Sequence, residues 1–307
     1  ANVMQLLENV RTAKASPTTI ATCMQMGKML KKKTILVGNC DGFVGNRMIG
    51  CYGAEAKQCA EDGAGFGRVD KAAEEFGMAM GPMSMGDLVG QELFWNARKS
   101  AGDMKKQTKV YMGPYEVVDW LCEKGRYGLK TPDKSIGANG RGVYIHKGRD
   151  KWIDPEVEAK MEEVRKAKNH PARQVSDEEI IDRLFLPLIN EGFRILDEGI
   201  AQRSSDVDLA YIYGYGFPPA KGGPLFYAEN YVGLPTVLEK LKKYDAEAKK
   251  RYTTNKAYLP VDYFEPSKLL VECVEAINAG MKAQVPPGVP MVDAVLVYKK
   301  KMAKSKL

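Results

Sequence analysis

Histidine is scarce in this sequence, and its scarcity limits the kinds of metal site that the chain could form. Two histidines, His146 and His170, stand among 307 residues, and six cysteines are scattered without a CxxC pair. Protein zinc sites are built from clustered cysteine and histidine ligands, so we expect no metal centre. Unpaired cysteines in a chain of this length favour free, mostly buried thiols in a reducing compartment. Both histidines stand apart from other recognisable motifs, and we expect them at the surface.

Long apolar runs are also missing. No stretch approaches the roughly 18 uncharged apolar residues of a membrane-spanning helix, so we expect no span. The opening ANVMQLLENV lacks the basic start and apolar core of a secretory signal. It also lacks an initiating Met, and we therefore expect residue 1 not to be the beginning of the gene product. Apolar residues make up 44% of the chain, a share typical of a globular protein.

Charge is unevenly distributed. The net charge is +7, and residues 98–151 alone hold 13 Lys and Arg against 6 Asp and Glu. A basic surface attracts anionic partners such as nucleic acid or the phosphates of coenzyme A, but solvated loops explain the same charge. The chain shows no reading helix and no interleaving of aromatic with basic residues, so we expect no nucleic-acid partner.

The first 40 residues show a strand–helix–strand pattern. Residues 3–10 (VMQLLENV) and 34–38 (TILVG) are typical of strands. Between them, Ser16 and Pro17 fit the cap and the first position of a helix. Such a unit normally belongs to a parallel sheet with more strands. We therefore interpret residues 1–40 as the remnant of a larger sheet domain.

An internal repeat dominates the rest of the sequence. Three residues of one segment recur 136 positions later, and an aspartate and a Gly-Pro pair follow in the same order. The pairs are Arg47 and Arg183, Glu55 and Glu191, Gly63 and Gly199, Asp70 and Asp208, and Gly81-Pro82 and Gly223-Pro224. An ordered series of this kind favours duplication over chance similarity between helices. We predict two similar helical units, and the recurrence of Arg47 favours a structural role for it.

The segments around the repeats are less regular. Residues 125–151 are rich in glycine and lysine and predict a loop, and 154–169 predict an exposed linker helix. Ser176 begins a capping signal for a helix over 178–198, which we expect Pro187 to bend. A further apolar stripe predicts a helix over 266–281.

These motifs together resemble the 3-hydroxyacyl-CoA dehydrogenase family, over nearly the whole chain. NVMQLLENV followed by VGNCDGFVGNR resembles the end of its nucleotide domain, and MGPMSMGDLVG resembles a turn of the following helical domain. The second copy resembles the duplicated domain of multifunctional enzymes that fuse an enoyl-CoA hydratase to the dehydrogenase. The resemblance implies a mainly α fold, with two tandem helical domains behind a remnant of a Rossmann domain. The expected ranges are 1–40 for the remnant, 41–150 and 176–298 for the helical domains, 151–175 for a linker helix and 299–307 for a basic tail.

The resemblance implies oxidation of a 3-hydroxyacyl-CoA to a 3-ketoacyl-CoA with NAD. In this family a histidine is the base and a glutamate holds its ring, and Glu8 matches that glutamate. Asn46 matches the asparagine that helps to bind substrate. A strand-end position for Glu8 and a helix cap for Asn46 are the alternatives. The matching histidine would precede residue 1. GAGFG (63–67) and GANGRG (137–142) lack the strand–turn–helix context of a dinucleotide fingerprint. We therefore expect the chain alone to be inactive.

The last three residues, Ser305, Lys306 and Leu307, form the S-K-L address of peroxisomal proteins. They predict a peroxisomal location and an import receptor as partner. Acyl-CoA is the expected substrate, and self-association is a further possibility. The alternative function is a non-catalytic helical module for dimerisation or acyl-CoA contact.

Overall fold

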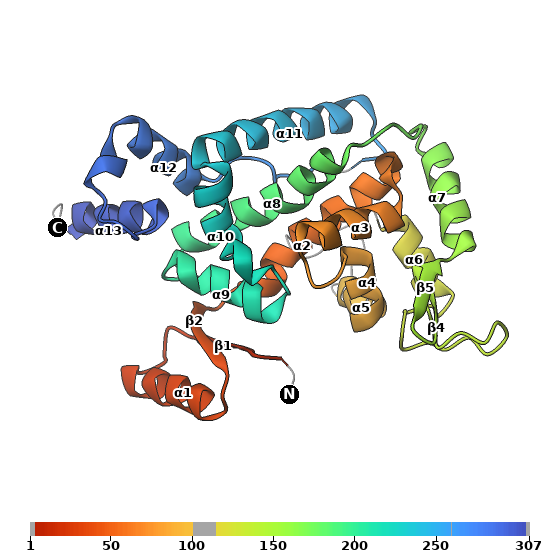
Figure 1. Ribbon diagram of the computed structural model, residues 1–307, viewed down its shortest axis with the longest axis horizontal. Coiled ribbons are helices and arrows are strands. Elements are labelled where there is room, and N and C mark those ends of the chain that lie inside the picture. The colour runs from red at the N-terminus through yellow and green to blue at the C-terminus, as the bar shows by residue number, and fades with distance from the viewer. Residues whose placement is uncertain (1–3, 101–114, 259, 305–307) are drawn as a thin grey trace. The chain divides into compact units, whose positions relative to one another are not determined.

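The computed structural model describes residues 4–100, 115–258 and 260–304, and helices dominate it (Figure 1). The predicted mainly α fold is confirmed. The chain forms two compact units. Unit 1 comprises residues 1–49, 185–249 and 261–307, and unit 2 comprises residues 50–184 and 250–260. The division falls inside helices α2 (Gly45–Cys59), α8 (Asp177–Asp197) and α11 (Leu234–Thr254), so each unit contains part of all three. The domain boundaries expected from the repeat remain a prediction.

Unit 1 begins with β1 (Leu6–Arg11), α1 (Pro17–Met29) and β2 (Lys33–Gly38). The strands are parallel and α1 packs beside them (Figure 1). The amide of Thr19 donates to the Ser16 hydroxyl at 3.1 Å, so Ser16 is the cap and Pro17 starts the helix. The predicted strand–helix–strand unit is confirmed, although β1 begins at Leu6 rather than at residue 3.

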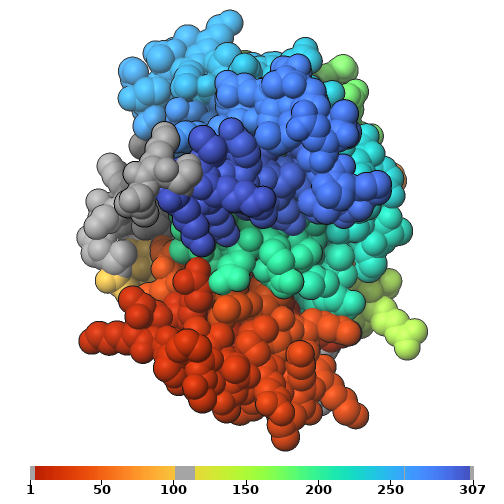
Figure 2. All heavy atoms as spheres, turned by 90° about the vertical axis from the view of Figure 1, so that its left-hand side faces the viewer, coloured from red at the N-terminus to blue at the C-terminus, as the bar shows by residue number. Residues whose placement is uncertain are grey.

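The remaining helices of unit 1 come from the second repeat and the end of the chain. They are α9 (Ser204–Gly214), α10 (Pro224–Tyr227), α11 (Leu234–Thr254), α12 (Lys268–Asn278) and α13 (Met291–Lys304). α9 packs against both strands. Asp293 ties α13 to the start of α9, because it accepts the amide and the hydroxyl of Ser204, both at 2.9 Å. Figure 2 shows the blue surface of this last segment lying on the green surface of the second repeat.

Unit 2 contains the helices of the first repeat and a small sheet. The helices are α3 (Phe66–Phe76), α4 (Pro82–Val89), α5 (Glu92–Ser100), α6 (Glu116–Glu123) and α7 (Pro155–Ala167). The antiparallel sheet consists of β3 (Gly140–Arg141), β4 (Tyr144–Lys147) and β5 (Asp150–Ile153). The prediction of a plain loop over 125–151 was therefore wrong. The expected exposed character of the linker helix was also wrong, since Val157, Met161 and Val164 of α7 are buried.

The two repeats fold alike where their aspartates recur. Asp70 accepts the amide of Met83 at 2.7 Å at the start of α4, and Asp208 accepts the amide of Leu225 at 2.7 Å at the start of α10. A Cβ on the preceding Gly81 or Gly223 would lie 2.2 or 2.3 Å from that aspartate. Each Gly-Pro turn therefore lets a buried carboxylate cap the following helix.

The repeated Arg and Glu residues exchange partners. In unit 1, Arg47 bonds Glu191 and, at 2.6 and 2.7 Å, Glu198. In unit 2, Arg183 bonds Glu55 at 2.6 Å and Asp62 at 2.7 Å. Glu191 and Glu198 stand 136 positions after Glu55 and Asp62, so the two sets are reciprocal. Arg47 and Arg183 are both buried, which gives them the structural role expected from the repeat.

Both histidines are mostly buried, so their expected place at the surface was wrong. His146 Nε2 lies 3.1 Å from Asp87, and His170 Nε2 lies 3.0 Å from Asp62. Their side chains are 12% and 21% exposed. Within the described ranges, no group of three metal-binding side chains gathers, and no helix has the length and apolar character that a membrane crossing requires.

Candidate functional site

Glu8 lies on β1, and its carboxylate reaches the start of α2. One oxygen accepts the amides of Val44 at 3.1 Å and Gly45 at 3.4 Å. Burial raises the pKa of Glu8, and the two amides oppose that rise. The carboxylate is therefore fixed in position by backbone donors at a helix start, where partial positive charge favours its ionised form.

Asn46 is the second residue of α2, and its side chain is exposed. Its Oδ1 accepts the hydroxyl of Tyr215 at 2.7 Å. Burial, and secondarily the charge of Glu8, raise the pKa of Tyr215. The structure thus brings Glu8 and Asn46 to the same end of α2. The backbone amides of Val44 and Gly45 at that helix start donate to Glu8. Glu8 therefore fills the capping role that was considered for Asn46.

Close backbone packing shapes this corner of unit 1. Gly42 has φ of 76°, a left-handed value that suits glycine, and it precedes the turn into α2. A Cβ on Gly45 would lie 2.1 Å from the ring of Tyr215, so only glycine lets that ring approach. Tyr211 donates its hydroxyl to the carbonyl of Gly45 at 3.1 Å and stacks on Tyr215 with ring centroids 5.1 Å apart.

Sequence reasoning missed the two tyrosines of the site. Tyr211 and Tyr215 belong to YIYGYG (211–216), where the first repeat carries no aromatic series. This difference between the copies is the sequence signal that could have identified the two tyrosines. Tyrosines that are present in the second copy and missing from the first indicate a contact that the second copy makes and the first does not.

The arrangement can orient a base. A carboxylate held by two amides can accept a ring N–H from a histidine and keep its other nitrogen pointing at a hydroxyl proton. The exposed Nδ2 of Asn46 remains available as a hydrogen-bond donor, because Tyr215 occupies Oδ1. The site therefore holds a fixed carboxylate and an exposed amide side chain at the same end of α2.

The glycine clusters do not form a dinucleotide site among the described residues. GAGFG lies between a π-helical turn (Ala60–Ala64) and α3, so it follows a helix. GANGRG (137–142) contains β3 and leads to β4, so no helix follows it directly. The turn between β1 and α1, residues 12–16, contains no glycine. The residues present therefore do not fit NAD. Ser305, Lys306 and Leu307 lie outside the described residues.

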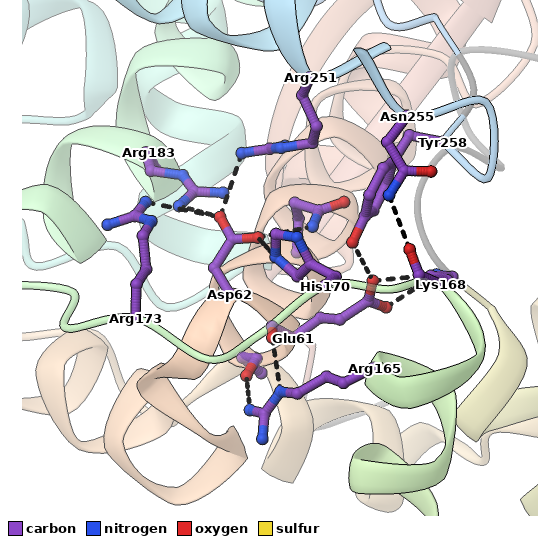
Figure 3. Close-up of polar contacts among 12 residues, drawn as sticks. Glu61, Asp62, Arg165, Lys168, His170, Arg173, Arg183, Arg251, Asn255 and Tyr258 are labelled. Atoms are coloured by element: carbon purple, nitrogen blue, oxygen red, sulfur yellow. Dashed lines mark hydrogen bonds and ion pairs between the residues drawn. The ribbon is translucent and has the colours of Figure 1, made fainter.

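A second polar cluster, drawn in Figure 3, lies in unit 2 around Glu61 and Asp62. Its bonds join the π-helical turn to α7, α8 and the segment 250–260. Asp62 bonds His170, Arg183 and, at 3.1 Å, Arg251; Glu61 bonds Lys168 at 2.9 Å and Tyr258 at 2.8 Å. Against the effect of burial, His170 and the two arginines hold the pKa of Asp62 well below its ordinary value. The cluster therefore joins separate segments of the chain, and the hydrogen bond to Asp62 holds His170 within it.

Comparison with known proteins gives the family. Residues 42–136 and 180–286 match the family described as 3-hydroxyacyl-CoA dehydrogenase, C-terminal domain. A peroxisomal bifunctional enzyme of Homo sapiens is 43% identical over 80% of this chain and 34% of that protein. A peroxisomal fatty acid beta-oxidation multifunctional protein of Oryza sativa is 33% identical over 88% of this chain and 35% of that protein. The chain thus spans about a third of the length of these relatives.

A solved structure agrees with these relatives. The dehydrogenase part of multifunctional enzyme 1 from C. elegans superposes with a TM-score of 0.61 at 26% identity, over 88% of this chain and 56% of that chain. The relatives are named as peroxisomal proteins in animals and plants, which agrees with the predicted compartment. With its duplicated helical fold and both matched segments, the chain belongs to the 3-hydroxyacyl-CoA dehydrogenase family.

Proposed function

We propose that this chain acts within a peroxisomal β-oxidation enzyme that oxidises 3-hydroxyacyl-CoA to 3-ketoacyl-CoA with NAD and that also carries enoyl-CoA hydratase activity. The family and its peroxisomal relatives support this proposal. The observation that carries it is the Glu8 carboxylate, held by two amides at the start of α2 beside the exposed amide of Asn46.

In the proposed mechanism, Glu8 is a positioning residue. It accepts the ring N–H of a histidine base and stabilises the imidazolium that forms when the base takes the hydroxyl proton. Asn46 donates Nδ2 to the substrate, while Tyr215 fixes the orientation of the amide. The described residues do not form a dinucleotide site, so no step through the nicotinamide is assigned to them.

The first test is activity of the 307-residue chain alone. We expect no reduction of NAD when the chain is mixed with a 3-hydroxyacyl-CoA, because neither His146 nor His170 is free to act as the base. Formation of NADH would contradict this part of the proposal.

The second test is calorimetric titration with a 3-hydroxyacyl-CoA in the absence of NAD. We expect weak binding that falls about tenfold in Asn46→Ala, the cost of one lost hydrogen bond. Asn278→Ala, which removes an exposed asparagine at the end of α12, is the matched control. Binding that is the same in both variants would favour the alternative, a helical module that contacts acyl-CoA or packs without catalysis.

The carboxyl-terminal address is the basis for a proposed import receptor. Residues 301–304 at the end of α13 are exposed, and the tripeptide follows them directly in the sequence. We expect removal of Ser305, Lys306 and Leu307 to abolish peroxisomal accumulation of a fluorescent fusion. Unchanged accumulation would contradict the assignment of the tripeptide.

A further inference from the structure

Each repeat carries a pair of acidic residues that receives a later segment of the chain. The first pair is Asp70 and Asp87, and the second is Asp208 and Glu229. Asp87 and Glu229 are 142 positions apart, and the same spacing separates Gly81 from Gly223 in the two turns. The members of one pair therefore correspond to the members of the other, and the two surroundings can be compared.

In the first repeat, the start of β4 fills the space beside the pair. Asp87 accepts the amides of Val143 at 3.0 Å and Tyr144 at 2.9 Å. The hydroxyl of Tyr144 then donates to Asp70 at 2.8 Å. Ser84 donates to the same oxygen of Asp70 at 2.6 Å. The backbone amides at the start of β4 thus bind the Asp87 carboxylate, and the Tyr144 hydroxyl donates to the Asp70 carboxylate.

In the second repeat, only the backbone half of this arrangement is present. Glu229 accepts the amide of Met291 at 2.9 and 3.0 Å, so the segment before α13 docks there as β4 does on Asp87. Among the described residues, Asp208 accepts hydrogen bonds from two backbone amides alone, Leu225 at 2.7 Å and Phe226 at 3.3 Å. No side chain of the described part of the chain donates to Asp208 as Tyr144 donates to Asp70.

A cavity of about 340 Å³ lies beside Asp208, within unit 1. This volume is at the lower end of the range of small-ligand sites. Its walls combine apolar and aromatic groups with a few polar ones, among them Ser204, Asp208, Phe226, Lys282, Pro286 and Val289. Asp208 is 7% exposed, and its buried carboxyl has backbone donors but lacks the hydroxyl donors that Ser84 and Tyr144 give to Asp70.

The electrostatics of the cavity suit a neutral hydroxyl donor. Burial, opposed by the two amides and reinforced by the charges of Asp293 and Glu229, raises the pKa of Asp208 to about 7. Lys282 is the cation of the lining, and its side chain is exposed. An anionic ligand would meet the carboxyl groups of Asp208 and Glu229, which both line the cavity, whereas a neutral phenol would meet a strong hydrogen-bond acceptor.

We propose that the cavity beside Asp208 binds a small neutral phenol. Its hydroxyl donates to Asp208 as the Tyr144 hydroxyl donates to Asp70, and its ring lies among Phe226, Pro286 and Val289. The chain itself thus provides the template for the ligand in its first repeat. This site is separate from the Glu8 corner and does not depend on the proposed dehydrogenase function.

The test is calorimetric titration of the full chain with p-cresol, and with toluene as the analogue without a hydroxyl. We expect p-cresol to bind at least about tenfold more tightly than toluene, because toluene has no hydroxyl to donate to the buried carboxyl. Asp208→Asn keeps one oxygen for the Leu225 amide and should weaken p-cresol binding about tenfold. Val289→Trp fills the cavity from its exposed rim and should abolish binding without touching the helix cap.

Val297→Trp is the matched control, since Val297 is exposed on α13 and outside the cavity lining. It should bind p-cresol as the unchanged chain does. Failure of p-cresol to bind the unchanged chain, equal affinity for toluene, or full binding to Val289→Trp would each overturn the proposal. A tyrosine-containing peptide that binds where p-cresol does not would also overturn it, and would indicate a protein partner instead.

Discussion

Replacing Arg183 by methionine tests the reciprocal ion pairs most directly. The Arg183 side chain is 2% exposed, and its partners Glu55 and Asp62 are 0% and 1% exposed. Methionine keeps much of the volume but leaves two buried carboxylates with one cation fewer. Breaking a buried ion pair from one side costs about 3–5 kcal/mol of unfolding free energy. For a unit of this size, that loss lowers Tm by roughly 10 °C.

The assay is thermal unfolding of the variant beside a matched surface control. Arg68→Met removes an arginine that is 45% exposed and is paired with an Asp177 that is 65% exposed. Such an exposed pair contributes at most about 1 kcal/mol, so Tm should change by a few degrees. Arg47→Met should behave like Arg183→Met, because Arg47 makes the corresponding pairs. Equal unfolding temperatures for Arg183→Met and Arg68→Met would refute the reasoning.

Two further predictions concern single positions. Gly45→Ala should destabilise the chain by about 1–3 kcal/mol in urea unfolding, since the new Cβ would lie 2.1 Å from Tyr215. In Gly53→Ala, in the same helix, the new Cβ would meet Lys57 Nζ at an ordinary contact distance of 3.9 Å, so this variant should stabilise by about 1 kcal/mol; equal effects would contradict the packing argument. The raised pKa of Asp208, about 7 in the folded chain against an ordinary 3.8, means that its protonated form stabilises the fold and that this contribution is lost as pH rises through 7. Asp208→Asn should therefore gain stability relative to the unchanged chain as the pH rises from 3.8 to about 7, and parallel pH profiles would exclude this role.

Local signals predicted local structure well. Ser16 and Pro17 mark the start of α1 because cap and first-turn chemistry involve adjacent residues. The repeat also predicted that Arg47 is structural. Arg47 recurs as Arg183, and the glutamates that pair with these arginines recur as well. The small sheet over 140–153 was missed because strands of two to four residues, interrupted by glycine, show no apolar alternation.

Long-range contacts account for most of the remaining misses. The predicted pair Glu8 and Asn46 does meet at one helix start, but Tyr215 reaches Asn46 from 169 positions away. Both histidines bond buried aspartates at sequence distances of 59 and 108. No periodicity or spacing reports such contacts, because they depend on how finished elements pack.

The exchange of partners between the repeats has an evolutionary consequence. A single copy would carry an arginine and two acids whose partners in this chain belong to the other copy. In a one-copy ancestor, a self-complementary homodimer would provide the same pairs between two chains. Gene fusion would then convert a concentration-dependent association into a tethered one, with the linker supplying a high effective concentration.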